Sequence, residues 1–162
     1  MNRERGITLI ELVIVISIII ILVAIGVSFE GWMARYRIES QIKEIYSDLM
    51  LARARAMQMN RVHFVDIKTN EYQIFEDTDE DGTLNNSDKP LWTTPKRLQY
   101  KPLWTGIITM NERGLVIPNE TIRLDTGDRE ADFDCIVIFS TRINIGKWDN
   151  CDDDDENECC AK

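Results

Sequence analysis

The sequence predicts an α+β protein in which one long N-terminal helix packs against a C-terminal antiparallel β-sheet domain. Two patterns support this fold class. No proline occurs between residues 7 and 60, a stretch that is apolar first and then periodic in the manner of a helix. From residue 62 onward, short segments with a period of two alternate with turn residues. The chain has 162 residues, so one small domain follows the helix.

The first half of the predicted helix is apolar over a membrane length. Residues 7–29 contain only four polar side chains, Thr8, Glu11, Ser17 and Ser28. At ~1.5 Å per residue, this run crosses a hydrocarbon core of about 30 Å, so it predicts a transmembrane helix. A charged group inside such a run costs ~2.5–3.5 kcal/mol at mid-helix and less near the edge. Glu11 therefore indicates a function and a partner of opposite charge.

The second half of the predicted helix, residues 30–60, is amphipathic. Its apolar seam repeats at four- and three-residue steps through Ile38, Ile42, Ile45, Leu49, Ala52 and Ala56. The seam spans too few heptads for a coiled coil, which favours packing beneath a sheet. The whole helix is expected to contain roughly 50 residues and to be ~80 Å long.

The β domain is expected at residues 61–148, followed by an acidic, Cys-rich tail at 149–162. Strands are predicted at residues 62–67, 72–75, 98–103, 106–110, 115–117, 121–124, 135–140 and 142–145. A turn is predicted at residues 111–114, where Asn and Gly enclose two charged residues.

The N-terminus carries a family resemblance. A basic leader, MNRERG, precedes the segment ITLIEL and the long apolar run. This arrangement resembles the class III leader of type IV pilins and pseudopilins, and so implies the pilin fold. It implies that prepilin peptidase removes residues 1–6 by cutting between Gly6 and Ile7, and that the new amine is methylated. The chain departs from the family at Ile7, where Phe is usual, and in lacking a proline near Ser28.

Physical chemistry gives Glu11 a role in this setting. The new α-amine of Ile7, with a pKa of roughly 7.7–8.0, is largely cationic at neutral pH. A carboxylate beside it neutralises both charges in a low-dielectric environment. Glu11 is therefore predicted to pair with the amine of Ile7, within one chain or between subunits, and to set the register of filament assembly.

The resemblance implies a structural subunit, a minor pilin or pseudopilin, of a type IV pilus or a type II secretion pseudopilus. Its partners would be other pilin or pseudopilin subunits, prepilin peptidase, the inner membrane and the assembly platform. The chain would cross the bacterial inner membrane once, with its N-terminus cytoplasmic and its C-terminal domain periplasmic or extracellular in a filament. Residues 51–62, LARARAMQMNRV, also resemble the helix-to-strand junction of the GspH/FimT type.

Three other interpretations remain open. Cleavage by signal peptidase after Gly26 would release a soluble protein, although residues 7–29 exceed the ~7–15 residues of a secretory apolar region. The FimT resemblance raises a fibre-tip role in adhesion or DNA uptake, with Arg142 and Lys147 as phosphate contacts. The acidic tail that follows argues against DNA. A membrane-anchored calcium-binding domain that does not polymerise is the third.

One loop has the spacing of a calcium site. Its predicted ligands are Asp77, Asp79, Asp81, Thr83, Asn85 and Asp88, at positions 1, 3, 5, 7, 9 and 12, with Gly82 at position 6. Position 12 is Asp rather than the longer Glu, which weakens bidentate closure. We expect an affinity of about 10⁻⁴–10⁻³ M for Ca²⁺. The alternative is a solvated acidic turn.

Four cysteines, Cys135, Cys151, Cys159 and Cys160, lie near the C-terminus. An even set in an exported domain indicates disulfides, with three complete pairings open. A bridge from Cys151 to Cys159 or Cys160 would fix the tail, and Cys135 would hold the other cysteine. No histidine lies nearby, which disfavours zinc. Residues 152–158 carry six carboxylates and are expected to be solvated.

No pattern in the sequence indicates catalysis, and we expect no enzyme. His63 is the only histidine and lies in a predicted strand, which favours a structural role. The net charge of −9 is a poor match for nucleic acid or anionic lipid.

Overall fold

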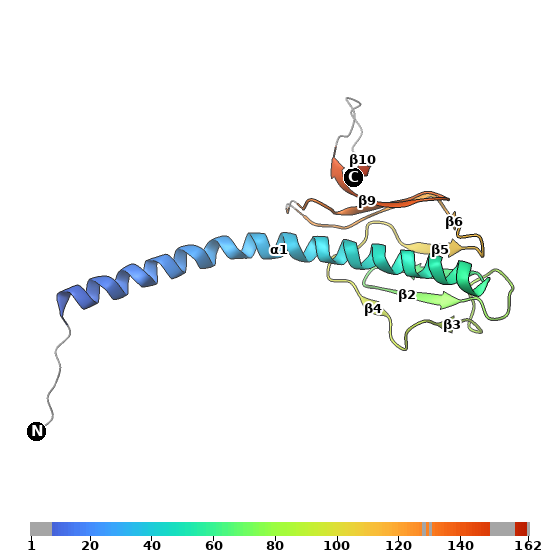
Figure 1. The fold of residues 1–162 in the computed structure, drawn as a ribbon, viewed down its shortest axis with the longest axis horizontal. Coiled ribbons are helices and arrows are strands. Elements are labelled where there is room, and N and C mark those ends of the chain that lie inside the picture. Colours follow the sequence, from blue (N-terminus) through green and yellow to red (C-terminus); the bar gives the residue numbers. More distant parts are fainter. Residues whose placement is uncertain (1–7, 128, 130, 150–157, 162) are drawn as a thin grey trace, which may run out of the picture. The chain divides into compact units, whose positions relative to one another are not determined.

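A computed structural model describes residues 8–127, 129, 131–149 and 158–161. The chain divides into two compact units, Met1–Ala34 and Arg35–Lys162. It has an α+β fold, with a long N-terminal helix and antiparallel sheets (Figure 1), as predicted. Helix α1 (Leu9–Met59) contains 51 residues, which confirms the expected length.

Both ends of α1 are defined by local hydrogen bonds. The Thr8 hydroxyl accepts a hydrogen bond from the backbone N–H of Glu11 at 3.3 Å, which is an N-cap. At the other end Asn60 adopts a φ of 52°. The N–H of Arg61 donates to the carbonyl of Ala56 at 3.2 Å, as in a Schellman C-cap. The C-cap explains why the helix ends just before the first strand.

The apolar seam of α1 is the centre of the core in the Arg35–Lys162 unit. Each of its residues, Ile38, Ile42, Ile45, Leu49, Ala52 and Ala56, is at most 1% exposed. They share one cluster with residues of both sheets, including Val65 and Ile108 of one sheet and Ile122 and Ile136 of the other. The prediction that the seam packs beneath a sheet is confirmed.

The first sheet contains β1 (His63–Ile67), β2 (Glu71–Glu76), β3 (Lys89–Pro90), β4 (Lys96–Arg97), β5 (Gly106–Met110) and β6 (Val116–Ile117). Its order is β3-β2-β1-β5-β6, and β4 also pairs with β2. All these pairings are antiparallel. His63 is fully buried at the start of β1, which agrees with a structural role.

The second sheet contains β7 (Glu120–Arg123), β8 (Cys135–Ile138), β9 (Ile143–Asp149) and β10 (Glu158–Ala161). Its order is β10-β9-β8-β7, again antiparallel. Figure 1 shows the strands of both sheets gathered along the second half of α1. Strand β9 extends beyond the predicted range, and the short strands β3, β4 and β10 were not predicted.

The strand predicted at residues 98–103 is wrong. In this segment only Pro102 forms a bridge, a single one with Leu124. Gln41 of α1 holds the segment instead: its side-chain amide donates to the carbonyl of Tyr100 at 2.7 Å. Its side-chain oxygen accepts from the N–H groups of Gln99 and Tyr100 at 2.8 and 2.9 Å. A helix side chain therefore satisfies backbone groups that a neighbouring strand would otherwise satisfy.

The predicted turn at residues 111–114 is confirmed. The N–H of Gly114 donates to the carbonyl of Asn111 at 2.9 Å. Gly114 has a φ of 74°, a conformation that favours glycine. The turn directs the chain from β5 into β6.

Candidate functional site

The predicted assembly residue lies in the first turn of α1. Glu11 is exposed, and Gly6 and Ile7 lie outside the described residues. Among the residues that the structure describes, no lysine or arginine forms an ion pair with Glu11. Its carboxylate is therefore available to a cation supplied from elsewhere.

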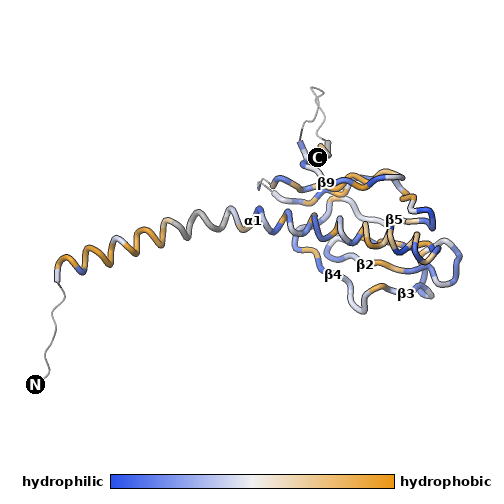
Figure 2. Tube along the Cα trace, in the orientation of Figure 1, coloured by the Kyte–Doolittle hydropathy of each residue, from blue (hydrophilic) through white to orange (hydrophobic). Residues whose placement is uncertain are grey.

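The apolar side chains of residues 9–23 are exposed, with exposed fractions from 48% at Ile16 to 80% at Leu9. Figure 2 shows this part of α1 as predominantly hydrophobic. A contiguous apolar surface of this size marks a place of contact with lipid or protein.

Within the described part of the chain, no helix has both the length and the hydropathy needed to span a membrane.

The acidic loop between β2 and β3 brings three of its predicted ligands together. Asp77, Asp79 and Asp81 each place a carboxylate oxygen within 4.8 Å of the other two. Asp77 is only 2% exposed, whereas Asp79 and Asp81 are exposed. The cluster therefore has one buried carboxylate at its base and two that face solvent.

Two positive φ angles, 58° at Glu80 and 73° at Gly82, turn the chain back over Asp77. The N–H of Gly82 then donates to Asp77 Oδ2 at 2.9 Å. The backbone N–H and the hydroxyl of Thr83 donate to Asp81 Oδ1 at 2.7 and 2.9 Å. A Cβ at Gly82 would have open space around it, so the backbone angle is the reason for glycine here.

Like Thr83, the predicted ligands Asn85 and Asp88 form hydrogen bonds within the loop. Asp88 Oδ1 accepts from the N–H of Thr78 at 3.3 Å, and Asp88 Oδ2 accepts from the N–H of Asn85 at 2.8 Å. The Asn85 side-chain amide donates to Asp79 and Asp81 at 2.9 Å each. Asp88 therefore closes the loop, and Asn85 bridges the two exposed carboxylates.

The carboxylates differ in their protonation energetics. Burial raises the pKa of Asp77, the backbone amides of Gly82 and Glu80 oppose that change, and Asp79 and Asp88 add to it. The backbone N–H and hydroxyl of Thr83 lower the pKa of Asp81. Within the described residues, Asp77 Oδ1 is buried and has no hydrogen-bond partner. The cluster therefore contains one carboxylate oxygen whose acceptor capacity is unused.

A disulfide joins Cys135 of β8 to Cys159 of β10, which is one of the pairings left open by the sequence. Strand β10 lies so close against β9 that a Cβ at Gly146 would collide with the backbone carbonyl of Cys160. Cys151 lies outside the described residues, and none of the cysteines described here is a free thiol. The bridge fixes the last strand to the second sheet.

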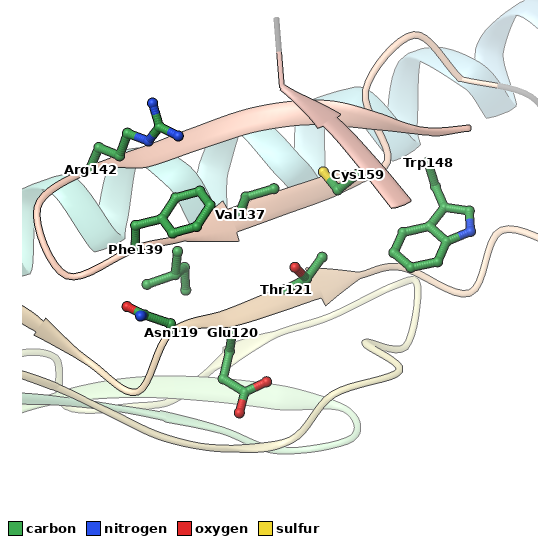
Figure 3. A pocket seen from close by; sticks show the side chains of 9 residues that line it. Asn119, Glu120, Thr121, Val137, Phe139, Arg142, Trp148 and Cys159 are labelled. Atoms are coloured by element: carbon green, nitrogen blue, oxygen red, sulfur yellow. The ribbon is translucent and has the colours of Figure 1, made fainter. Parts of the chain in front are cut away.

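The two predicted phosphate contacts lie in different grooves. Arg142 lines a groove of about 570 Å³ on the second sheet, where its guanidinium carbon is 4.7 Å from the Phe139 ring centroid. Figure 3 shows this pair at one end of the groove and Trp148 at the other. Lys147 lines a separate groove of about 290 Å³ and pairs with Asp149 at 3.3 Å. DNA contact through both residues stays a prediction.

The second groove contains residues that the sequence did not indicate. Arg123 and Arg129 line it with Lys147, and Arg123 lies 4.7 Å from the Trp148 ring centroid. Arg123 belongs to β7 and Trp148 to β9, and β8 lies between these strands, so the two side chains approach each other across β8. No spacing along the chain signals such a pair.

Comparison with known families gives one finding. The prokaryotic N-terminal methylation motif matches residues 1–27, which confirms the predicted leader. No curated protein and no solved structure matches the chain. The N-terminal motif and the α+β fold, with its long helix on antiparallel sheets, support a type IV pilin-like protein.

Proposed function

We propose that the chain is a minor pilin or pseudopilin, a non-enzymatic subunit of a type IV pilus or of a type II secretion pseudopilus. The observation that carries this proposal is the N-terminal methylation motif at residues 1–27, which leads directly into an exposed apolar helix. The motif supplies the processing signal, and the helix supplies the surface for assembly.

Processing creates the charge that Glu11 needs. Cleavage between Gly6 and Ile7 by prepilin peptidase leaves an α-amine four residues before Glu11, a spacing that places the two on one face of a helix. Glu11 is exposed in the first turn of α1 and has no cationic partner among the described residues. Pairing with the amine of its own or a neighbouring subunit lets both charges enter an apolar bundle.

The apolar side chains of residues 9–23 need an apolar environment at every stage. Before assembly, the inner membrane provides it around residues 7–29, with the leader in the cytoplasm and the β domain outside. After assembly, the helices of neighbouring subunits provide it. The assembly platform moves the subunit from one environment to the other.

The experiment is the intact mass and the N-terminal peptide of the protein isolated from its native membrane. A chain that begins at Ile7 with a methylated amine supports the proposal. A chain that begins at Val27 identifies a secreted soluble protein, and an uncut Met1 identifies an ordinary anchor. Either of those results contradicts the proposal.

A second measurement distinguishes the two filament systems. Recovery of the processed chain with sheared surface fibres indicates a pilus. Retention in the cell envelope, with protein secretion lost on gene deletion, indicates a pseudopilus.

A further inference from the structure

We infer that the loop at residues 77–88 binds one Ca²⁺ ion through the carboxylates of Asp77, Asp79 and Asp81. This inference concerns the β domain alone and does not depend on the proposed filament role. Two observations carry it together: the converging carboxylates and the unused acceptor at the base of the cluster.

The first step concerns Asp77. The residue is only 2% exposed, and its Oδ2 accepts a hydrogen bond from the N–H of Gly82 while its Oδ1 is buried without a partner among the described residues. A buried acceptor without a partner costs free energy, because it has lost water and gained nothing. Asp77 shares a cluster with Asp79 and Asp81, so a cation held between the three supplies the missing interaction.

The second step concerns charge. Three carboxylates whose oxygens lie within 4.8 Å of one another repel each other, and the Asn85 amide that bridges Asp79 and Asp81 carries no charge to balance theirs. Arg61, which lies near this loop, pairs with Glu76 at 3.3 Å and with Glu80 at 3.5 Å rather than with the three aspartates. Among the described residues, none of the three aspartates takes part in an ion pair.

The third step concerns the identity of the ion. All the donors are oxygens, which hard cations such as Ca²⁺ prefer, and two oxygens bound to one Ca²⁺ lie at most about 5 Å apart. The ligand oxygens of the three aspartates lie within 4.8 Å of one another, which falls inside that span. Water completes the six to eight oxygens that Ca²⁺ takes, since Asp79 and Asp81 face solvent. Asp88 does not join the three; it holds the backbone of Thr78 and Asn85 and so fixes the loop.

Binding here would act on the edge of the first sheet. The backbone N–H of Asp77 donates to the carbonyl of Val62 at 3.0 Å, next to the end of α1. Beyond the loop, β3 pairs with β2 through Phe75 and Pro90. Because the loop joins β2 to β3, an ion in it would hold the edge strand in place and stabilise the folded domain.

The test uses the full chain in detergent, first freed of metal with a chelator. Equilibrium dialysis against radioactive CaCl₂ measures binding, and thermal unfolding with and without CaCl₂ or MgCl₂ measures stabilisation. The variant Asp79→Ala/Asp81→Ala removes two exposed ligands. Its matched control, Glu112→Ala/Asp125→Ala, removes two exposed carboxylates far along the chain from the loop.

We expect one saturable site, with a Kd of about 10⁻⁴–10⁻³ M, and a higher melting temperature in CaCl₂ than in MgCl₂. The loop variant should weaken binding at least about tenfold and lose the thermal shift, whereas the control variant should keep both. Circular dichroism checks that both variants are folded.

Three results would overturn the inference. The first is no saturable binding at about 10 mM CaCl₂. The second is equal binding by the loop variant and the wild type, which would locate the ion elsewhere, for example at residues 152–158. The third is an equal effect of MgCl₂ and CaCl₂.

Discussion

The hydroxyl of Tyr72 donates a hydrogen bond to the carboxylate of Asp48 at 2.6 Å, and this bond joins β2 to α1. The ammonium of Lys96 in β4 contacts the same carboxylate oxygen at 2.6 Å and Glu44 at 3.1 Å. It also lies 4.6 Å from the ring centroid of Trp92. Asp48 is only 7% exposed, so its buried charge is balanced by a phenol and an ammonium from two strands.

This cluster predicts a loss of stability at alkaline pH. Burial, and then the hydrogen bond and charge of Asp48, raise the pKa of Tyr72. Burial lowers the pKa of Lys96, but hydrogen bonds to Asp48 and Glu44 outweigh it and raise the pKa overall. Groups with a raised folded-state pKa stabilise the protein below their unfolded values, about 10 for Tyr and 10.4 for Lys, and that stabilisation is lost as the pH rises further.

We therefore expect the free energy of unfolding to fall above about pH 10, and Tyr72→Phe to make that fall shallower. At pH 7 the same variant should lose about 1.5–3 kcal/mol, the value of a hydrogen bond to a charged group. Urea unfolding between pH 7 and pH 11 measures both effects, with Tyr46→Phe as the control. Equal alkaline slopes in wild type and Tyr72→Phe would contradict this account.

Gln41 provides a second prediction. Gln41→Ala leaves the carbonyl and N–H of Tyr100 and the N–H of Gln99 without their helix partner. Each buried group left unsatisfied costs about 1–3 kcal/mol, so we expect a total loss of at least about 2 kcal/mol. Gln58→Ala makes the same substitution at an exposed position near the end of the same helix and should be nearly neutral. Equal unfolding free energies for the two variants would show that the hydrogen bonds of Gln41 do not stabilise the domain.

The sequence predicts well what depends on local periodicity. The seam from Ile38 to Ala56 follows from helical spacing, and Asp77, Asp79 and Asp81 converge because their spacing and Gly82 make the loop turn locally. Features that depend on distant partners are not predictable in this way. Leu98 and Tyr100 alternate in burial with their neighbours as they would in a strand, yet Gln41, about 60 residues earlier, replaces the neighbouring strand.

The disulfide and the pair of Arg123 and Trp148 show the same limit. Spacing left the pairing of Cys135 open, because the partner depends on where β10 lies beside β9. The approach of Arg123 to Trp148 likewise depends on the strand order of the second sheet. Such contacts follow from topology rather than from neighbouring residues.

Gly146 provides a third prediction. In Gly146→Ala the new methyl group would collide with the backbone carbonyl of Cys160, which cannot move without displacing β10. We expect a loss of about 1–3 kcal/mol and faster hydrogen exchange at the amides of residues 158–161. Gly31→Ala is the control, because a Cβ there meets nothing within 4 Å. Unchanged exchange at β10 would show that the strand tolerates the methyl group.

Glu11 provides the last prediction. Glu11→Gln keeps the size of the side chain but removes the charge that would neutralise the amine of Ile7. Breaking a buried ion pair costs about 3–5 kcal/mol, which corresponds to a decrease of roughly two orders of magnitude or more in the assembly equilibrium.

The N-terminal methylation motif and the apolar surface remain, so cleavage and membrane association should be retained. Ser17→Ala is the control within the same helix, because among the described residues the Ser17 hydroxyl donates to the carbonyl of Val13 in the preceding turn. Immunoblots of sheared fibres and of membranes should show Glu11→Gln confined to the membranes and Ser17→Ala in both fractions. If Glu11→Gln enters fibres at the wild-type level, the amine must find another counter-charge, and Glu11 does not set the register.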